Sequence, residues 1–120
     1  MIEKVNVADK FDQFREHWQP KIIGELNDSY IKAVKVRDTF VWHDHQNEDE
    51  LFFVVKGRMV LKLRDGDITL LPGEFVIVPR GVEHCPVADE ETHVLLLEPK
   101  TTVNTGDVRN ERTVPTPERI

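Results

Sequence analysis

Short runs in which apolar and polar residues alternate, each ended by a turn signal, place the strongest constraint on the fold of this chain. Alternation with a period of two is typical of strands that bury one face. The turn signals include Asp65-Gly66 and Pro72-Gly73, and an Asp-Gly pair between two alternating runs strongly favours a hairpin. Many short strands at this spacing predict an all-β sandwich or barrel. The expected strands are residues 21–25, 30–37, 40–43, 50–56, 58–64, 67–71, 74–78 and 92–98.

Two segments flank this region and follow other patterns. Phe11, Phe14 and Trp18 are three and four residues apart, which predicts a short amphipathic helix over residues 9–18 whose aromatic side chains enter the core. Asp9 is the expected N-cap of this helix. The polar, proline-marked residues after position 99 show no periodicity, so we expect either a packed extension or a loose tail without a DNA-binding helix pair.

Composition limits the class of protein and its partners. A chain of 120 residues has the length of one domain, and no apolar run approaches the roughly 18 residues that a membrane span needs. With 16 basic and 22 acidic side chains the net charge is -6, which makes nucleic acid and anionic membranes poor partners. No apolar segment follows the first residue, and Cys85 is the single cysteine, so we expect a cytoplasmic protein without a secretory signal.

Three of the five histidines lie beside the expected strands together with a carboxylate. On a strand, His43 and His45 would project from the same face, and a hairpin from residues 40–45 into the next strand would bring Glu50 beside them. His84 follows another apolar run and would come from a neighbouring strand. Taken singly, each histidine is more often a surface or core residue, and the acidic cluster at Glu50 more often a solvated loop.

The spacing of these residues resembles a known family. The pattern His43-x-His45-x4-Glu50-x6-Gly57, followed by Gly73-x5-Pro79-x-Gly81-x2-His84, is similar to the two motifs of the cupin superfamily, and in particular to small single-domain bacterial cupins of the mannose-6-phosphate-isomerase-like kind. The family usually has Gly where Arg37 stands and Asn where Ala88 stands.

The resemblance implies a fold, a metal site and an assembly. The fold would be a double-stranded β-helix, or jelly roll, with a barrel core over about residues 20–99 and a polar extension over 100–120 in a single domain. His43, His45, Glu50 and His84 would bind one divalent transition metal, namely Fe, Mn, Zn or Ni. Small cupins also dimerise, so we expect a homodimer, with residues 21–25 as a candidate contact.

These expectations leave three functions open. The first is a mononuclear metalloenzyme of the dioxygenase, isomerase or lyase type that acts on a small oxygen-bearing metabolite. The second is a non-catalytic cupin that binds or senses a small ligand, and the third is a barrel with a purely structural metal.

Side chains around the expected site are interpreted by their strand parity. Phe52 and Val54 should face the inside together with Glu50, and Cys85 should point away from His84 and pack. The pattern leaves open whether His93 lines the lumen or packs in the core, and it predicts an exposed His17. Lys35, Arg37 and Gln46 are possible contacts for an anionic substrate, but such residues are more often solvated residues at strand edges.

Overall fold

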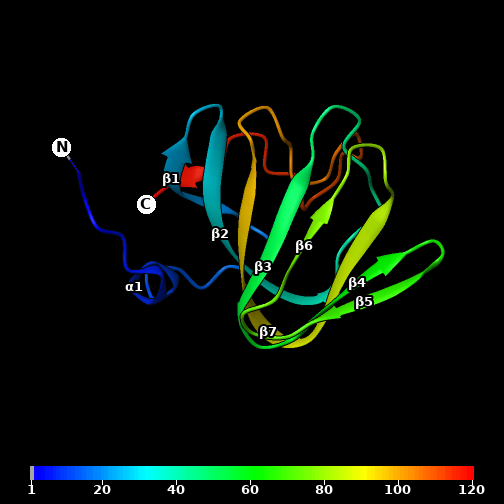
Figure 1. The fold of residues 1–120 in the computed structure, drawn as a ribbon, viewed down its shortest axis with the longest axis horizontal. Helices are drawn as coiled ribbons and strands as arrows, with labels where there is room; N and C mark the ends of the chain where they lie inside the picture. Colours follow the sequence, from blue (N-terminus) through cyan, green and yellow to red (C-terminus); the bar gives the residue numbers. More distant parts are fainter. Residues whose placement is uncertain (1) are drawn as a thin grey trace.

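The computed structural model describes residues 2–120 and contains one short helix and eight strands (Figure 1). The strands form one branched sheet in the order β5-β4-β7-β2-β1-β8, and β3 pairs with both β6 and β7. The sheet bends over to form two layers but stays open at its ends, as expected for a double-stranded β-helix, so the all-β class is confirmed. The elements are α1 (Val7–Phe11), β1 (Lys21–Leu26), β2 (Ser29–Thr39), β3 (Glu50–Lys56), β4 (Met59–Leu63), β5 (Gly66–Leu70), β6 (Phe75–Val78), β7 (His84–Pro99) and β8 (Glu118–Arg119).

The long strand β7 joins the two layers. Its first residues pair with β4, its last residues pair with β3, and β2 follows it along both parts. The sequence predicted only the second part, residues 92–98, because the acidic residues 89–91 interrupt the apolar alternation. The ladder with β2 skips residues 89–91 at an irregularity and resumes on both sides of them, at Ala88 and at Thr92.

The expected strand over residues 40–43 does not form. The backbone N–H of Phe40 donates to the carbonyl of Pro86, and His43 makes an isolated bridge with His84. The connection between β2 and β3 therefore lies against the start of β7, and the expected hairpin into β3 is wrong. This placement still brings His43 to the end of β3.

The N-terminal helix is shorter than predicted, and its cap is also different. Asn6 is the N-cap and accepts a hydrogen bond from the backbone N–H of Asp9, and the helix ends at Phe11. Trp18 lies outside the helix because its backbone N–H donates to a β2 carbonyl and its φ angle is 63°. The aromatic side chains are nevertheless buried, as the spacing indicated.

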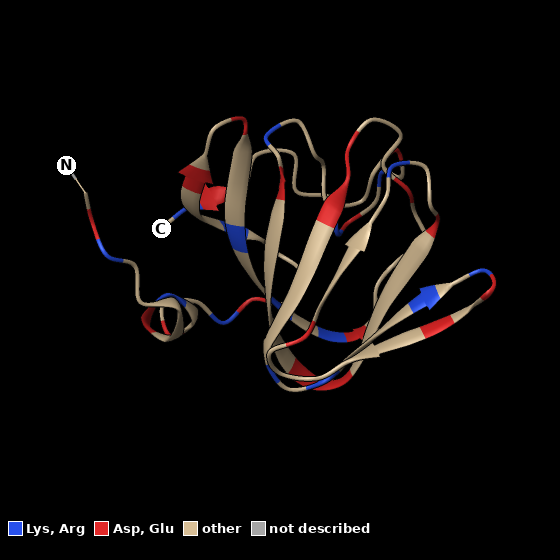
Figure 2. Ribbon diagram, in the orientation of Figure 1, with Lys and Arg blue, Asp and Glu red and all other residues tan. Residues whose placement is uncertain are grey.

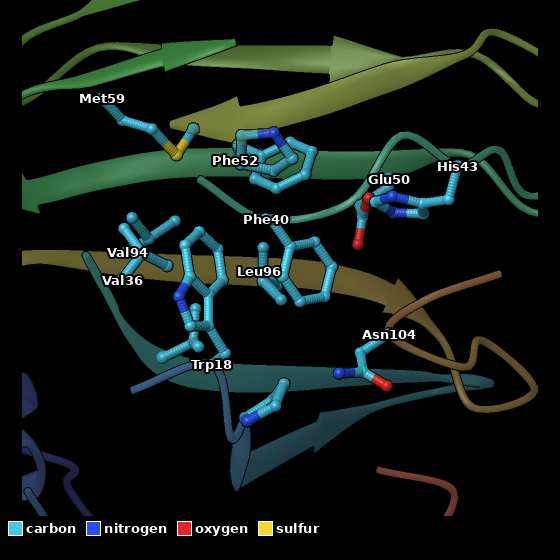
Figure 3. Close-up of a pocket in the computed structure, with 13 residues that line it drawn as sticks. Trp18, Val36, Phe40, His43, Glu50, Phe52, Met59, Val94, Leu96 and Asn104 are labelled. Carbon is cyan, nitrogen blue, oxygen red and sulfur yellow. The ribbon is translucent and has the colours of Figure 1, made fainter. Parts of the chain in front are cut away.

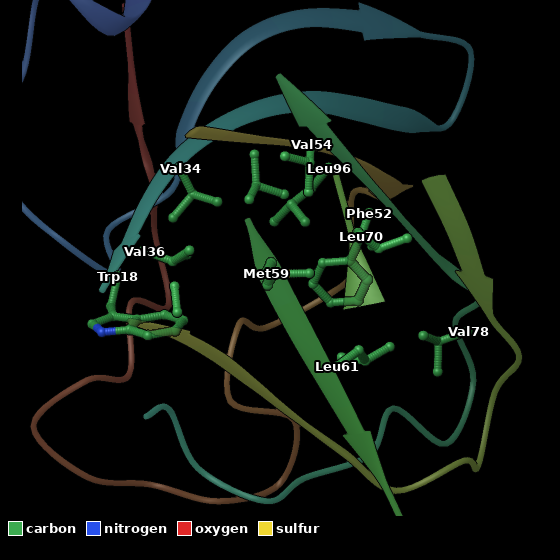
Figure 4. Close-up of a cluster of buried hydrophobic side chains, with 12 residues drawn as sticks. Trp18, Val34, Val36, Phe52, Val54, Met59, Leu61, Leu70, Val78 and Leu96 are labelled. Atoms are coloured by element: carbon green, nitrogen blue, oxygen red, sulfur yellow. The ribbon is translucent and has the colours of Figure 1, made fainter. Parts of the chain in front are cut away.

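The core consists of two clusters on opposite faces of the sheet. The larger cluster lies between the two layers and includes Phe52, Val54 and Leu61 (Figure 4). The smaller cluster holds α1 against the outer face through Phe11 and Phe14. The predicted parity of β3 is confirmed, since Glu50, Phe52 and Val54 are buried and the residues between them are only half-buried.

The C-terminal segment is a packed extension. Thr102, Asn104 and Thr105 are buried, and β8 pairs in parallel with β1 at Lys21 and Ile22. Of the two readings left open by the sequence, the loose tail is therefore wrong. Across residues 2–120, every helix is too short to cross a bilayer.

Candidate metal centre

Four side chains meet where β3 and β7 begin. Glu50 is the first residue of β3 and His84 is the first residue of β7, whereas His43 and His45 come from the connection between β2 and β3. Reciprocal backbone hydrogen bonds of 3.1 and 2.9 Å join His43 to His84, and the N–H of Gly81 donates to the His45 carbonyl at 2.8 Å. The backbone thus holds the irregular connection beside both strands.

The candidate ligand atoms face one another at distances suited to a shared ion. One ligand atom from each of the four residues lies within 4.8 Å of all the others. Oε1 of Glu50 is 3.3 Å from Nε2 of His45 and 3.3 Å from Nε2 of His84. All four residues are buried, with exposed fractions of 5% or less. The structure therefore brings together every residue that the motif predicted for the site.

In His43 and His84, a hydrogen bond made by Nδ1 determines that Nε2 is the nitrogen available to a ligand. Nδ1 of His43 lies 2.9 Å from the Val41 carbonyl, and Nδ1 of His84 lies 2.8 Å from the Val82 carbonyl. Because a carbonyl only accepts, each Nδ1 carries the proton and each Nε2 keeps its lone pair for a ligand.

Three of the atoms that face the centre have no hydrogen-bond partner within the part of the chain that the structure describes. These atoms are Nε2 of His45, Oε1 of Glu50 and Nε2 of His84. Buried polar atoms without partners are costly, and lone pairs of imidazole and carboxylate suit a divalent transition metal. The donor set therefore fits such an ion.

Burial and mutual contacts shift the pKa values of the group. Burial lowers the pKa of His43 to about 4, so its imidazole is neutral near pH 7. Burial alone would raise the pKa of Glu50, but its close contacts with Glu98, His45 and His84 bring it well below its usual value. The centre thus contains an ionised carboxylate beside neutral His43.

A buried pair behind Glu50 was missed from the sequence. Nζ of Lys32 donates to Oε1 of Glu98 at 2.7 Å, and both side chains are almost fully buried. Burial, with the neighbouring Glu50 carboxylate, raises the pKa of Glu98 well above its usual value. Strand parity could have found the pair, since Lys32 and Glu98 continue the inward-facing alternation of Val34 and Leu96.

An apolar pocket adjoins His43 and Glu50 (Figure 3). Its other walls are aromatic and aliphatic side chains that include Trp18, Phe40 and Phe52. The ring of Phe40 meets the ring of His43 edge-on at 5.4 Å, which shields the site from solvent on that side.

The remaining residues singled out from the sequence lie outside the pocket. Lys35 donates to the Phe14 carbonyl on the outer face, and the side chains of Arg37 and Gln46 are exposed. His93 stacks on Phe11 at 4.4 Å in the smaller cluster and therefore belongs to the core. Three further positions have simple roles: His17 is partly exposed and pairs with Glu91, Cys85 is buried packing, and Val54 is core.

Comparisons with known proteins agree on the fold. Residues 31–99 match the family described as Cupin domain. A crystal structure of a cupin-2 domain containing protein from Shewanella frigidimarina is 46% identical with a TM-score of 0.79, and the alignment covers 80% of this chain and 94% of that one.

Curated relatives are more distant and include two dioxygenases. Acireductone dioxygenase of Bacillus subtilis is 27% identical, with 78% of this chain and 58% of the relative covered. A 3-hydroxyanthranilate 3,4-dioxygenase of Aspergillus fumigatus is 32% identical, with coverages of 62% and 42%. The chain thus spans about half the length of these relatives. By the family match, the fold and the motif residues, the chain belongs to the cupin-domain family.

Proposed function

We propose that the protein binds one divalent transition metal through His43, His45, Glu50 and His84 and acts on a small oxygen-bearing metabolite. The observation that carries this proposal is the set of three buried ligand atoms that face one another without partners among residues 2–120. Three neutral imidazoles and one carboxylate leave a divalent ion with a net charge of +1, suited to Fe, Mn, Zn or Ni.

The protein side chains have defined roles in this proposal. When bound, such an ion supplies a Lewis acid that polarises substrate oxygens. The carbonyls of Val41 and Val82 hold two imidazoles in the required tautomer. Nζ of Lys32 donates to Glu98 next to Glu50, and its positive charge limits charge repulsion behind the site. The similarity to two dioxygenases supports a dioxygenase type of reaction, ahead of an isomerase or lyase type.

A thermal melting experiment tests the metal site. Saturation at about 100 times the dissociation constant adds about 2.7 kcal/mol to the free energy of unfolding, so Zn2+ should raise the Tm of chelator-treated protein. The His45→Gln variant should lose this rise, whereas the matched control His17→Gln, at a partly exposed site, should keep it. An unchanged Tm for wild-type protein, with metal removal and reloading verified by elemental analysis, contradicts the proposal.

A second test separates an enzyme from a binding or sensing module. Fe2+-loaded protein is mixed with small hydroxy acids and diketones, and oxygen consumption and product formation are measured. Turnover that disappears in His84→Ala supports the enzyme. Tight binding of the same compounds without turnover favours the non-catalytic cupin instead.

The same proposal includes a homodimer formed through an outer apolar face. We define this face by the outward side chains of β3, β6 and the end of β7: Leu51, Phe53, Phe75, Ile77, Leu95 and Leu97. Phe75 and Ile77 are 58% and 55% exposed, and Figure 2 shows no charged residue between the ends of β3 and β6. A contiguous apolar face of this kind indicates an interface.

Sedimentation tests the homodimer. The edge predicted from residues 21–25 is partly occupied by β8 at Lys21 and Ile22, so the outer apolar face is the better contact. Wild-type protein should sediment as a dimer at micromolar concentration, and Ile77→Lys should sediment as a monomer. A wild-type monomer at that concentration contradicts this part of the proposal.

The organisation and location of the chain complete the proposal. Residues 1–120 form one domain, with the barrel over about 20–99 and the extension 100–120 packed on it, as the pairing of β8 with β1 supports. The partner is a small molecule, neither nucleic acid nor membrane, which agrees with the net charge of -6. The free, buried Cys85 agrees with a reducing cytoplasmic setting.

A further inference from the structure

The apolar pocket beside the metal centre has a volume of about 40 Å3, which limits what it can take. His43 and Glu50 lie at one end of this pocket, and Val36, Met59 and Val94 lie at the other (Figure 3). At roughly 10–15 Å3 for each water molecule, the space corresponds to about three waters. A ligand anchored at the metal centre therefore has room for a short tail that points toward the aliphatic end.

The polar groups in the walls away from the metal centre already have partners. Nδ2 of Asn104 donates to the Arg112 carbonyl at 2.7 Å, and Oδ1 of Asn104 accepts from the Val114 N–H at 2.8 Å. Nε1 of Trp18 donates to the Arg37 carbonyl at 2.8 Å. Among the described residues, these walls therefore offer a ligand tail no side chain with a free hydrogen-bonding group.

A charged tail would also lack a counter-ion. Among residues 2–120, no Lys or Arg lines this pocket. Lys32 is committed to Glu98 at 2.7 Å, and the guanidinium of Arg112 stacks on Trp18 at 5.4 Å from the ring centroid, outside the lining. Burying a carboxylate in such a place without a partner is strongly unfavourable.

The wall formed by Trp18 is held in one conformation. A φ angle of 63° is unusual for a bulky aromatic residue and persists only where the surroundings enforce it. The backbone N–H of Trp18 donates to the Lys35 carbonyl at 2.8 Å, and its ring stacks on Phe40 at 4.5 Å. The apolar wall is therefore preorganised for a ligand.

We infer that the pocket takes a small molecule with an oxygen-chelating, singly charged head and a short uncharged apolar tail. The head matches the net charge of +1 at the proposed metal centre, and the tail fills the aliphatic end of the pocket. A branched 2-hydroxy acid belongs to this class, whereas dicarboxylates and sugar phosphates do not. This inference rests on the proposed function, because the head needs the metal.

A pair of matched ligands tests the inference. 2-Hydroxy-4-methylpentanoate and malate share the same head and the same number of non-hydrogen atoms, but one ends in an isopropyl group and the other in a carboxylate. Their dissociation constants are measured by calorimetry on Zn2+-loaded protein, on Zn2+-free protein, and on free Zn2+ in the same buffer. Zinc content is measured after each titration.

We expect the branched acid to bind Zn2+-loaded protein at least tenfold more tightly than malate, after correction for the ratio found with free Zn2+. Neither ligand should bind the Zn2+-free protein. Equal or tighter binding of malate, or no binding of either ligand with Zn2+ retained, overturns the inference and leaves the metal site intact. Failure to load Zn2+ at all contradicts the proposed function itself.

A conservative substitution in the pocket tests whether the preference for the branched acid arises there. Val36→Thr keeps the side-chain volume but adds a hydroxyl to the aliphatic end, so the preference for the branched acid should fall several-fold. The control Val60→Thr adds the same group on β4, outside this pocket, and should keep the preference. An unchanged preference in Val36→Thr, with zinc content and melting temperature preserved, overturns the assignment of the tail to this pocket.

Discussion

Gly106, in the C-terminal extension, lies close to the connection between β2 and β3 that carries His43 and His45. We therefore predict a strong effect of Gly106→Ala. Gly106 has a φ angle of 62°, and an added Cβ would overlap the carbonyl oxygen of Asp44 and lie 3.1 Å from its carbonyl carbon. Asp44 lies between His43 and His45, so the clash would push on both candidate ligands. Backbone atoms cannot turn aside as a flexible side chain can.

The expected magnitude follows from two separate costs. A left-handed conformation at alanine costs about 1–2 kcal/mol, and overpacking against backbone adds about 1–3 kcal/mol. The sum of about 2–5 kcal/mol should lower Tm by roughly 8–20 °C in a domain of this size. Because metal ligands need placement to within about 0.5 Å, the Zn2+ dissociation constant should also rise at least tenfold.

The matched control is Gly73→Ala. Gly73 has a φ angle of 88°, and a Cβ there would meet open space among the described residues. This variant should therefore pay only the conformational cost of about 1–2 kcal/mol. Urea unfolding and Zn2+ titration of both variants test the reasoning, and equal stability losses with unchanged zinc affinity in both would refute it.

Three further predictions concern pH, reactivity and packing. Burial lowers the pKa of His45, but the close contact with the Glu50 carboxylate outweighs burial, and the net pKa is raised. Protons should therefore compete with Zn2+ already above pH 6.5, and a zinc affinity that stays constant from pH 8 to pH 6 would count against this. Cys85 is 1% exposed, and burial raises the pKa of its thiol. A thiol reagent should therefore label the native protein at least tenfold more slowly than the urea-unfolded protein, and equal labelling rates would contradict the burial of Cys85. Leu61→Ala should cost about 2–5 kcal/mol in urea unfolding because Leu61 is fully buried, and Val60→Ala on the other face should cost less than half as much; similar losses would be inconsistent with the described core.

Local alternation and turn chemistry made most strands predictable. The strand Glu50–Lys56 has the bounds that the sequence indicated, and its inward parity is the one observed. The first part of β7 was missed because residues 89–91 carry three acids, and because its pairing with β2 and β4 involves strands remote in sequence. Similarly, Trp18 follows helical spacing but leaves the helix because β2 offers its N–H a better partner.

The four candidate ligands were predictable from their spacing, but their surroundings were not. The sequence placed His43 on a strand next to β3, whereas the structure holds it by a bridge to His84. Lys32 and Glu98 lie 66 positions apart, so their ion pair depends on the register of β2 against β7. Local sequence patterns indicate which face a residue occupies, but not which distant residue it meets.

The metal content of untagged protein purified without chelator tests the central claim most directly. Elemental analysis of wild-type protein is compared with the double variant His45→Ala, His84→Ala, with folding of both verified by circular dichroism. We expect a near-stoichiometric divalent transition metal in the wild type and its loss in the variant. Folded wild-type protein without metal even after reloading, or equal metal content in both proteins, would contradict a metal centre formed by these residues.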